Sequence, residues 1–381
     1  MARINSNKKL TIALVANTTW NIYNFRLNLI DKFIDEGHEV AVIAPMDEYI
    51  FYKDKYPTIR HFNLRMLDRD GTNPLRDMML ILELTRKFRR IKPDIVLHFT
   101  NKPNIYGAIS SKMAGVKHSV AVVTGLGYAF IHDGFTHKLL SLMYKWTGRF
   151  HQKFIFENLD DRQLFVNLNI VKEINAIAVK GCGVNIDYFY PFPNGQIKAK
   201  TTFTFIGRLL YDKGIREFVN AAKIINEKYP NTAEFWVIGE LDDDNPATVN
   251  GDDVLDWVNN KIIRYWGFVK DVRPLLSKSD CVVLPSYREG LPRIVLEALA
   301  MAKPVITTDT PGCRETVFQN ENGWLIPSRN TEALVECIEN FLSLGHDKRH
   351  EMGNKGREFA ESIFNDKLIA RQIYDEVKNL I

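Results

Sequence analysis

Cysteine is scarce in this chain of 381 residues, and its four cysteines form no Cys-x-x-Cys pair. They lie far apart in the sequence, which fits reduced thiols better than disulfides or a zinc site; they are Cys182, Cys281, Cys313 and Cys337. Long apolar runs are also missing, because no stretch of about eighteen apolar residues occurs. The first residues carry no apolar core of a signal peptide. We therefore expect a cytoplasmic protein without a membrane-spanning helix.

Several binding signatures are absent as well. The first apolar run, residues 10–16, is followed by Asn17-Thr-Thr-Trp-Asn21 and not by Gly-x-Gly-x-x-Gly, which argues against a nicotinamide dehydrogenase. No zinc-finger, RNP or helix-turn-helix pattern supports binding of nucleic acid. The acidic run Asp242-Asp-Asp-Asn-Pro does not have the spacing of a calcium loop, so we interpret it as solvated surface.

The composition is that of an ordinary globular protein, with 45% apolar and 25% charged residues. Its length suits two domains of about 180 residues each. The net charge of +4 is unevenly distributed. Residues 1–190 hold 26 Lys and Arg against 18 Asp and Glu, a balance of +8, and the remaining residues hold 24 against 28, a balance of −4. The basic first half favours an anionic partner, either a diphosphate or an anionic membrane surface. The alternative is that its charges lie on a solvated surface without a partner.

Strand and helix patterns alternate twice along the chain. In the first half we expect strands at 10–16, 39–44, 94–98 and 119–123, with helices at 24–37, 75–91, 105–114 and 135–150. A second alternation contains strands near 202–206, 235–239, 262–267 and 305–307. Such alternation predicts an α/β fold with two doubly wound parallel sheets.

A short segment rich in turn residues separates the two halves. Residues 190–195 contain two prolines and an Asn-Gly pair, a composition typical of a linker. We therefore predict Rossmann-like domains at 1–190 and 196–365. A final helix is expected at 366–381, after a break near Phe364-Asn365.

Residues 286–305 contain two carboxylates, Glu289 and Glu297, with seven residues between them. Glu289 ends a loop, and Glu297 lies in a helix that Pro292 opens. The buried face of this helix is expected to carry Val295, Ala298, Leu299 and Ala302. Backbone N–H groups of its first turn, from Gly290 and Leu291 onward, would form a seat for an anion such as a diphosphate.

Two cationic side chains follow the strand at 202–206. Arg208 and Lys213 lie in a Gly-Arg…Lys-Gly frame that begins at Gly207. A planar guanidinium and a point-charge ammonium together suit a diphosphate leaving group. Ligands of paired α/β domains bind at the carboxyl ends of the strands, which is where both residues are expected.

Four sequence motifs, in this order along the chain, resemble those of the retaining GT-B glycosyltransferases called glycosyltransferase family 4. They are Phe205–Gly214, the Glu289/Glu297 block, Thr307–Glu315 and Asn322–Pro327, preceded by Gly181–Asn185 at the domain junction. In the first half, Asn24–Arg26, Asn101–Asn104 and Gly125–Gly127 are most similar to a narrower group. Its members are bacterial enzymes that add N-acetylgalactosamine or a related hexose to polyprenyl-diphosphate-linked sugars.

This resemblance implies two Rossmann-like domains facing each other across a cleft, with the last helix returning to the first domain. It also implies that Glu289 binds donor-sugar hydroxyls and Glu297 the ribose. The catalytic residues would be Glu289, Arg208 and Lys213. The donor site would contain Gly207, Arg208, Lys213, Val269, Glu289, Gly290, Leu291 and Glu297, with the base near Trp266–Val269. No metal is expected, because the two cations stabilise the leaving group.

The acceptor would bind to the first domain. The residues expected there are Asn17, Thr18, Trp20, Arg26, Asn101 and Lys102. Many family members carry a histidine near the strand at 119–123, where this chain has Thr124-Gly-Leu-Gly127. His98 and His132 lie nearby in sequence, but a lone histidine is more often structural. The sequence therefore does not identify the residue that acts as the acceptor base.

The resulting expectation is a peripheral enzyme on the cytoplasmic face of the inner membrane. It would transfer a hexose or N-acetylhexosamine from a UDP-sugar to a lipid-linked sugar in glycan assembly. A non-hydrolysing UDP-sugar epimerase of similar fold and a non-catalytic sugar-nucleotide sensor are the alternatives. The apolar stripe of residues 135–150, flanked by Lys138, Lys145 and Arg149, is the candidate membrane contact if it is not a core face.

Overall fold

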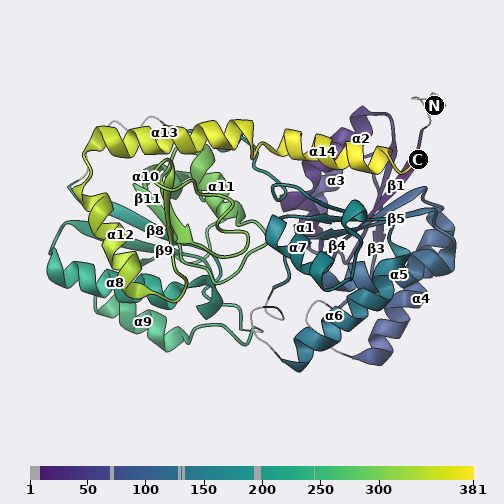
Figure 1. The fold of residues 1–381 in the computed structure, drawn as a ribbon, viewed down its shortest axis with the longest axis horizontal. Helices are drawn as coiled ribbons and strands as arrows, with labels where there is room; N and C mark the ends of the chain where they lie inside the picture. The colour runs from purple at the N-terminus through teal and green to yellow at the C-terminus, as the bar shows by residue number, and fades with distance from the viewer. Residues whose placement is uncertain (1–8, 69–72, 128–129, 131–133, 193–198, 244) are drawn as a thin grey trace. The chain divides into compact units, whose positions relative to one another are not determined.

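The computed structural model describes all residues except 1–8, 69–72, 128–129, 131–133, 193–198 and 244. The chain forms two compact units (Figure 1), one of Met1–Cys182 with Lys367–Ile381 and one of Gly183–Asp366. Part of the expected linker, 193–198, and His132 lie outside the described residues. Among the described helices, none is both long and apolar enough to cross a bilayer.

The first unit contains a seven-stranded parallel sheet with the order β3-β2-β1-β4-β5-β6-β7. Its strands are β1 (Thr11–Val15), β2 (Glu39–Ala44), β3 (Arg60–Asn63), β4 (Ile95–Phe99), β5 (His118–Val123), β6 (Lys153–Phe156) and β7 (Ala176–Ala178). Its helices are α1 (Thr19–Phe25), α2 (Leu27–Asp35), α3 (Tyr52–Lys55), α4 (Pro74–Ile91), α5 (Asn101–Ala114), α6 (Phe135–Thr147), α7 (Leu159–Asn167) and α14 (Asp366–Lys378). Short 3-10 turns are η1 (Glu48–Phe51), η3 (Gly148–Phe150) and η4 (Glu173–Asn175).

Both faces of this sheet are buried, as expected for parallel strands covered by helices. Ile12 and Leu14 of β1 belong to one apolar cluster, and Ala13 and Val15 belong to the cluster on the opposite face. Helix α14 packs on the first of these clusters through residues that include Ile373. The C-terminal helix thus joins the core of the first unit.

The second unit contains a six-stranded parallel sheet with the order β10-β9-β8-β11-β12-β13. Its strands are β8 (Thr201–Ile206), β9 (Ala233–Ile238), β10 (Arg264–Tyr265), β11 (Cys281–Leu284), β12 (Val305–Thr308) and β13 (Gly323–Ile326). Its helices are α8 (Ile215–Lys228), α9 (Gly251–Asn259), α10 (Arg273–Lys278), α11 (Arg293–Ala300), α12 (Thr331–Ser343) and α13 (His346–Ser362), with the 3-10 turn η5 (Tyr211–Lys213). In both units the strand order reverses beside the first strand, which is the arrangement of a doubly wound fold.

The structure divides the chain earlier than the sequence predicts. Residues 183–190 belong to the second unit and not to the first. The Val184 N–H donates to the Phe364 carbonyl at 2.8 Å, and Phe189 is buried in the core of the second unit. These contacts move the division ahead of the proline-containing segment, because proximity to the core decides membership and turn composition does not.

Two expected helices end differently in the structure. The helix predicted at 24–37 begins earlier and is interrupted at Arg26, whose φ of −125° and ψ of −1° separate α1 from α2. Ala302 was expected on the buried face of α11 but lies beyond its end, with a φ of 54°. The Lys303 N–H donates to the Ala298 carbonyl and the Ala302 N–H to the Leu299 carbonyl, which is the pattern that terminates a helix with a left-handed residue.

Candidate functional site

All predicted donor residues of the second unit except Glu297 lie on loops at the carboxyl ends of its strands, and glycines let these loops pack backbone to backbone. A Cβ on Gly239, after β9, would lie 1.8 Å from the carbonyl oxygen of Gly207, after β8. A Cβ on Gly214 would lie 2.1 Å from the carbonyl oxygen of Pro285, after β11. No larger residue fits these positions without backbone movement. The β8, β9 and β11 loops therefore form one tightly packed edge.

The Glu289 carboxylate lies at this edge with two donors. Lys213 Nζ and Ser286 Oγ donate to its Oε1 at 2.5 Å and 2.7 Å. The Glu289 N–H donates to the Pro311 carbonyl at 3.0 Å, and a Cβ on Gly312 would lie 2.5 Å from the Glu289 carbonyl oxygen. Loops after β11 and β12 thus position Glu289 beside the Lys213 cation.

Glu297 is held within α11, away from that ion pair. Arg293 Nε donates to Glu297 Oε1 at 2.8 Å across one helical turn. Burial raises the pKa of Glu297, and the neighbouring Arg293 charge partly offsets this effect. Pro292 is the residue before the first helical position of α11. The Glu297 side chain is only 13% exposed, and its carboxylate oxygens are able to accept hydrogen bonds from hydroxyl groups.

Arg208 forms an ion pair that the sequence did not predict. Its Nη1 donates to Asp242 Oδ2, on the loop after β9. Asp242 was interpreted as solvated surface, but its side chain is only 23% exposed and bonds to Arg208. This interpretation was wrong because sequence composition does not distinguish a solvated acidic loop from an acidic loop that folds back over the end of a strand.

The remaining predicted donor residues contribute mainly backbone or packing surface. Leu291 is buried, and Val269 is half-buried against the core. In the expected base-binding turn, the Trp266 N–H donates to the Val237 carbonyl at 2.9 Å and Gly267 has a φ of 64°. Backbone hydrogen bonds hold this turn, the second being from the Gly239 N–H to the Gly267 carbonyl at 2.9 Å.

In the first unit, the predicted acceptor residues Asn17, Thr18 and Trp20 lie at the carboxyl end of β1. Thr18 caps α1 by accepting from the Asn21 N–H at 3.0 Å. The Trp20 side chain is 44% exposed, and its ring lies edge-on to Phe25. Part of the Trp20 surface is therefore available to a sugar, and core filling does not account for it.

Arg26 is not exposed. Its Nη2 donates to Glu157 Oε1 at 3.2 Å, and both side chains are almost fully buried. Its guanidinium carbon lies 4.4 Å from the centre of the Phe99 ring. Burial raises the pKa of Glu157, against the effect of the Arg26 charge. The pair ties the α1–α2 junction to the residue that follows β6.

Asn101 and Lys102 begin α5 after β4. Tyr144 donates its hydroxyl to Asn101 Oδ1 at 2.8 Å, and Lys102 Nζ lies 3.1 Å from Asp77 Oδ1. His98 is fully buried on β4, where its Nε2 is 3.1 Å from Ser119 Oγ. Burial holds the pKa of His98 well below its ordinary value. This burial supports the expectation that His98 has a structural role and is not the acceptor base.

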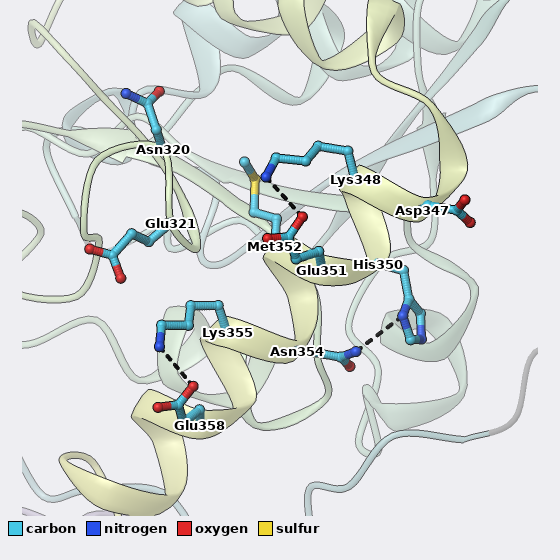
Figure 2. A pocket seen from close by; sticks show the side chains of 10 residues that line it. All are labelled: Asn320, Glu321, Asp347, Lys348, His350, Glu351, Met352, Asn354, Lys355 and Glu358. Atoms are coloured by element: carbon cyan, nitrogen blue, oxygen red, sulfur yellow. Dashed lines mark hydrogen bonds and ion pairs between the residues drawn. The ribbon is translucent and has the colours of Figure 1, made fainter.

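A separate hollow on the surface of the second unit contains none of the predicted donor residues. Figure 2 shows that it is lined mainly by side chains of α13. Four of its charged side chains are paired along the helix, Lys348 with Glu351 and Lys355 with Glu358, each at 2.8 Å. These paired, exposed groups form an ordinary helix surface, so the candidate site remains at the strand ends.

Both halves of the chain match family models. Residues 11–158 match the model described as "Glycosyl transferase 4-like", and residues 200–343 match "Glycosyl transferases group 1". The chain belongs to the glycosyltransferases. The two matched segments correspond to the two sheet-containing units.

Relatives of this glycosyltransferase are similar over most of its length. It is 29% identical over 352 residues to the N,N'-diacetylbacillosaminyl-diphospho-undecaprenol alpha-1,3-N-acetylgalactosaminyltransferase of Campylobacter jejuni, covering 87% of this chain and 89% of the relative. It is 28% identical to the UDP-Gal:alpha-D-GlcNAc-diphosphoundecaprenol alpha-1,3-galactosyltransferase of Escherichia coli, covering 69% and 70%.

Solved structures show that this glycosyltransferase has the GT-B fold. A glycosyltransferase from Rickettsia africae superposes with a TM-score of 0.77 at 19% identity and 98% coverage of both chains. The Anabaena protein HepE, solved in complex with UDP and glucose, superposes with a TM-score of 0.76 at 16% identity, covering 97% of this chain and 99% of HepE. The predicted fold class is confirmed.

Proposed function

We propose that this glycosyltransferase is a retaining enzyme that moves a hexose or an N-acetylhexosamine from a UDP-sugar to a polyprenyl-diphosphate-linked sugar. One observation supports the assignment of the donor site: Lys213 and Ser286 both donate hydrogen bonds to Glu289 at the strand ends of the second unit. The names of the Campylobacter and Escherichia relatives, which act on undecaprenyl-diphosphate-linked sugars, support the acceptor class.

Charge development in the reaction explains the choice of residues. The bond from the anomeric carbon to the diphosphate breaks with its electron pair on the phosphate oxygen, while the sugar becomes oxocarbenium-like. Preorganised cations at the departing oxygen stabilise this state. Lys213 and Arg208 supply two cations, so the proposal requires no metal and treats the UDP-sugar as a substrate. Glu289 accepts sugar hydroxyls, and Glu297 accepts the ribose hydroxyls.

The acceptor is assigned to the first unit. Trp20, with nearly half of its side chain exposed, offers an aromatic face to a sugar ring. Asn17, Thr18, Asn101 and Lys102 follow β1 and β4, where the strand order of the sheet reverses. Crevices at such reversals are the usual ligand sites of open α/β sheets. The buried Arg26–Glu157 pair would act there by supporting the loops and not by direct contact.

Peripheral binding to an anionic membrane is part of the proposal. On α6, Leu139, Leu142 and Trp146 are exposed, and Lys138 and Lys145 lie beside them. On α4, four further apolar side chains are exposed at helical spacing, namely Leu75, Met78, Met79 and Leu82. Helix α5 contacts both α4 and α6 (Figure 1). Exposed apolar stripes flanked by basic residues suit a bilayer surface, and a lipid-linked acceptor would be located there.

The decisive experiment follows the labelled sugar. Purified protein would be incubated with radiolabelled UDP-hexoses and UDP-N-acetylhexosamines and with membranes that contain polyprenyl-diphosphate sugars. Label extracted into organic solvent, with the anomeric configuration of the donor kept in the product, supports the proposal. Interconversion of free UDP-sugars would instead identify an epimerase. Release of UDP at a negligible rate with every donor and acceptor would indicate a sensor.

A further inference from the structure

The loop after β9 is tied to the Arg208 segment by backbone hydrogen bonds on both sides. The Leu209 N–H donates to the Glu240 carbonyl at 3.0 Å, and the Val249 N–H donates to the Leu209 carbonyl at 3.0 Å. The Tyr211 N–H donates to the Ala247 carbonyl at 2.8 Å. The loop and the residues that follow β8 are therefore a single paired structure.

Within this loop the backbone of Asp242 is fixed. Its N–H donates to Thr248 Oγ1 at 3.2 Å, and its carbonyl accepts from the Asn245 N–H at 2.8 Å. The Asn245 carbonyl in turn accepts from the Thr248 N–H at 3.0 Å. A carboxylate on such a fixed turn has little freedom, so its contact with Arg208 does not depend on two flexible side chains meeting by chance.

The contact leaves most of the Arg208 guanidinium available. An arginine side chain has five N–H donors in a planar fork, and Asp242 bonds at Nη1. Among the described residues, the Arg208 guanidinium has no second hydrogen-bond partner in the structure, and the side chain is 40% exposed. One edge of the fork is thus anchored, while other donors remain for a ligand.

We propose that Asp242 is a positioning residue that orients Arg208 toward the donor diphosphate; this rests on the proposed function. An unanchored arginine would lose rotamer entropy when it is immobilised. Anchoring it before the donor binds removes part of that loss from the transition state. Asp242 does not touch the donor, and its effect passes through Arg208.

The test is a double-mutant cycle, because a positioning residue has an effect only while its partner is present. The variants are Asp242→Ala, Arg208→Ala and the double variant, with kcat measured at saturating donor and UDP affinity by calorimetry. We expect Asp242→Ala to lower kcat by about 10–100-fold, as the loss of outer supporting contacts does elsewhere. In the Arg208→Ala background, the same change should have less than a twofold effect.

Two further variants separate positioning from misfolding. Asp242→Asn keeps an acceptor oxygen and should recover part of the lost rate. Asp243→Ala removes the exposed neighbouring carboxylate of the same loop and should leave kcat within twofold of the wild type. Equal effects of Asp242→Ala with and without Arg208 would overturn the proposal, as would tighter UDP binding by Asp242→Ala, which would reveal a competitor for Arg208.

Failure of this proposal is distinguishable from failure of the proposed function. A fully active Arg208→Ala variant would remove Arg208 from the donor site and refute the assignment of that site. An inactive Arg208→Ala variant together with a fully active Asp242→Ala variant would refute only the positioning role. Thermal unfolding of each variant checks that a lost rate does not result from an unfolded protein.

Discussion

At the residue scale, Glu289 and Glu297 differ in the partners that hold them. Glu289 shares its Oε1 between Lys213, from the segment after β8, and Ser286, from its own loop after β11. Glu297 is paired with Arg293 of its own helix. The first carboxylate is therefore coupled to the cation expected at the leaving group, and the second is paired within α11.

This difference predicts separate effects for two substitutions. Glu289→Gln keeps an acceptor near Lys213 but removes the charge, so kcat should fall far more than UDP affinity. Glu297→Ala should mainly weaken binding of both the donor and free UDP, because a ribose contact is lost. Steady-state kinetics and calorimetry measure the two quantities. The opposite pattern would mean that the roles are exchanged or wrongly assigned.

Loss of either cation should raise the barrier to transfer. Arg208→Ala and Lys213→Ala should each cost about 2.7–4 kcal/mol of transition-state stabilisation, as the loss of other preorganised oxyanion donors does. In single-turnover assays this corresponds to about a 100- to 1,000-fold slower transfer. EDTA should leave the wild-type rate unchanged, because side chains provide the positive charge. A strict requirement for Mn²⁺ or Mg²⁺ would contradict this account.

At the element scale, helix α13 crosses the end of α11 at a glycine. A Cβ on Gly353 would lie 2.2 Å from the Ala302 carbonyl oxygen. Glycine to alanine inside a helix normally stabilises by about 0.5–1 kcal/mol. Here the methyl group would meet backbone, which has to move, and overpacking of this kind costs about 1–3 kcal/mol.

Gly353→Ala should therefore lower the free energy of unfolding measured with urea. Gly251→Ala is the matched control, since a Cβ there would make an ordinary contact at 3.5 Å with Leu241. This control should be neutral or slightly stabilising. A stabilised Gly353→Ala variant would show that the approach of α13 to Ala302 is looser than the structure has it.

Strands of strong apolar character could be predicted from the sequence, whereas several short ones were missed. The strand Glu39–Ala44 agrees with the prediction at both ends because five of its six residues are buried and apolar. The three-residue β7 and the four-residue β3 and β6 carry too little periodic signal. The break at Arg26 was missed because a buried ion pair with Glu157, 131 residues away, decides it.

The candidate site shows the same limit. Lys213 and Glu289 were both expected at the donor site, and they are in contact although 76 residues separate them. The position of Lys213 after a predicted strand and the resemblance to a known family together supplied that expectation. The partners Asp242, Ser286 and Arg293 were missed, because a side chain that supports another has no sequence pattern of its own. Only the folded loops bring such residues together.

At the scale of the whole molecule, buried histidines make stability depend on pH. His151 Nε2 donates to the Asn104 carbonyl at 2.8 Å, and its Nδ1 lies 2.9 Å from Ser119 Oγ. Burial is the main cause that lowers the pKa of His151 to about 4, and burial also lowers the pKa of His98. Each is neutral in the folded protein, whereas each takes up a proton near pH 6.5 when the chain unfolds.

The sign of the effect follows from proton binding. Below pH 6.5 the unfolded chain holds more protons than the folded one, so the free energy of unfolding decreases as the pH is lowered. For His151 the loss approaches about 1.4 kcal/mol per pH unit and continues to the folded pKa near 4. Denaturant titrations from pH 7.5 to 4.5 should show this slope, and His151→Asn should reduce it. An equal slope in the variant would exclude His151 as a source.

The proposed membrane binding would involve the first unit as a whole, because its two exposed apolar stripes lie on separate helices. Leu142 and Trp146 of α6 are 64% and 52% exposed, and Leu75 of α4 is 67% exposed. The stripes alone would bind any bilayer weakly, whereas the excess of basic residues favours an anionic one.

Vesicles rich in anionic lipid should therefore sediment the wild-type protein at low salt, and high salt should release it, since surface charges are screened within about 8 Å at physiological ionic strength. Reversal of three α6-region charges to Glu should weaken sedimentation without changing donor hydrolysis; the residues are Lys138, Lys145 and Arg149.

The matched control reverses three lysines of the second unit, namely Lys223, Lys261 and Lys348, with the same change in net charge. If both triple variants sediment equally, net charge and not the α6 surface controls binding. Equal sedimentation of the wild type by neutral vesicles would exclude electrostatic docking altogether.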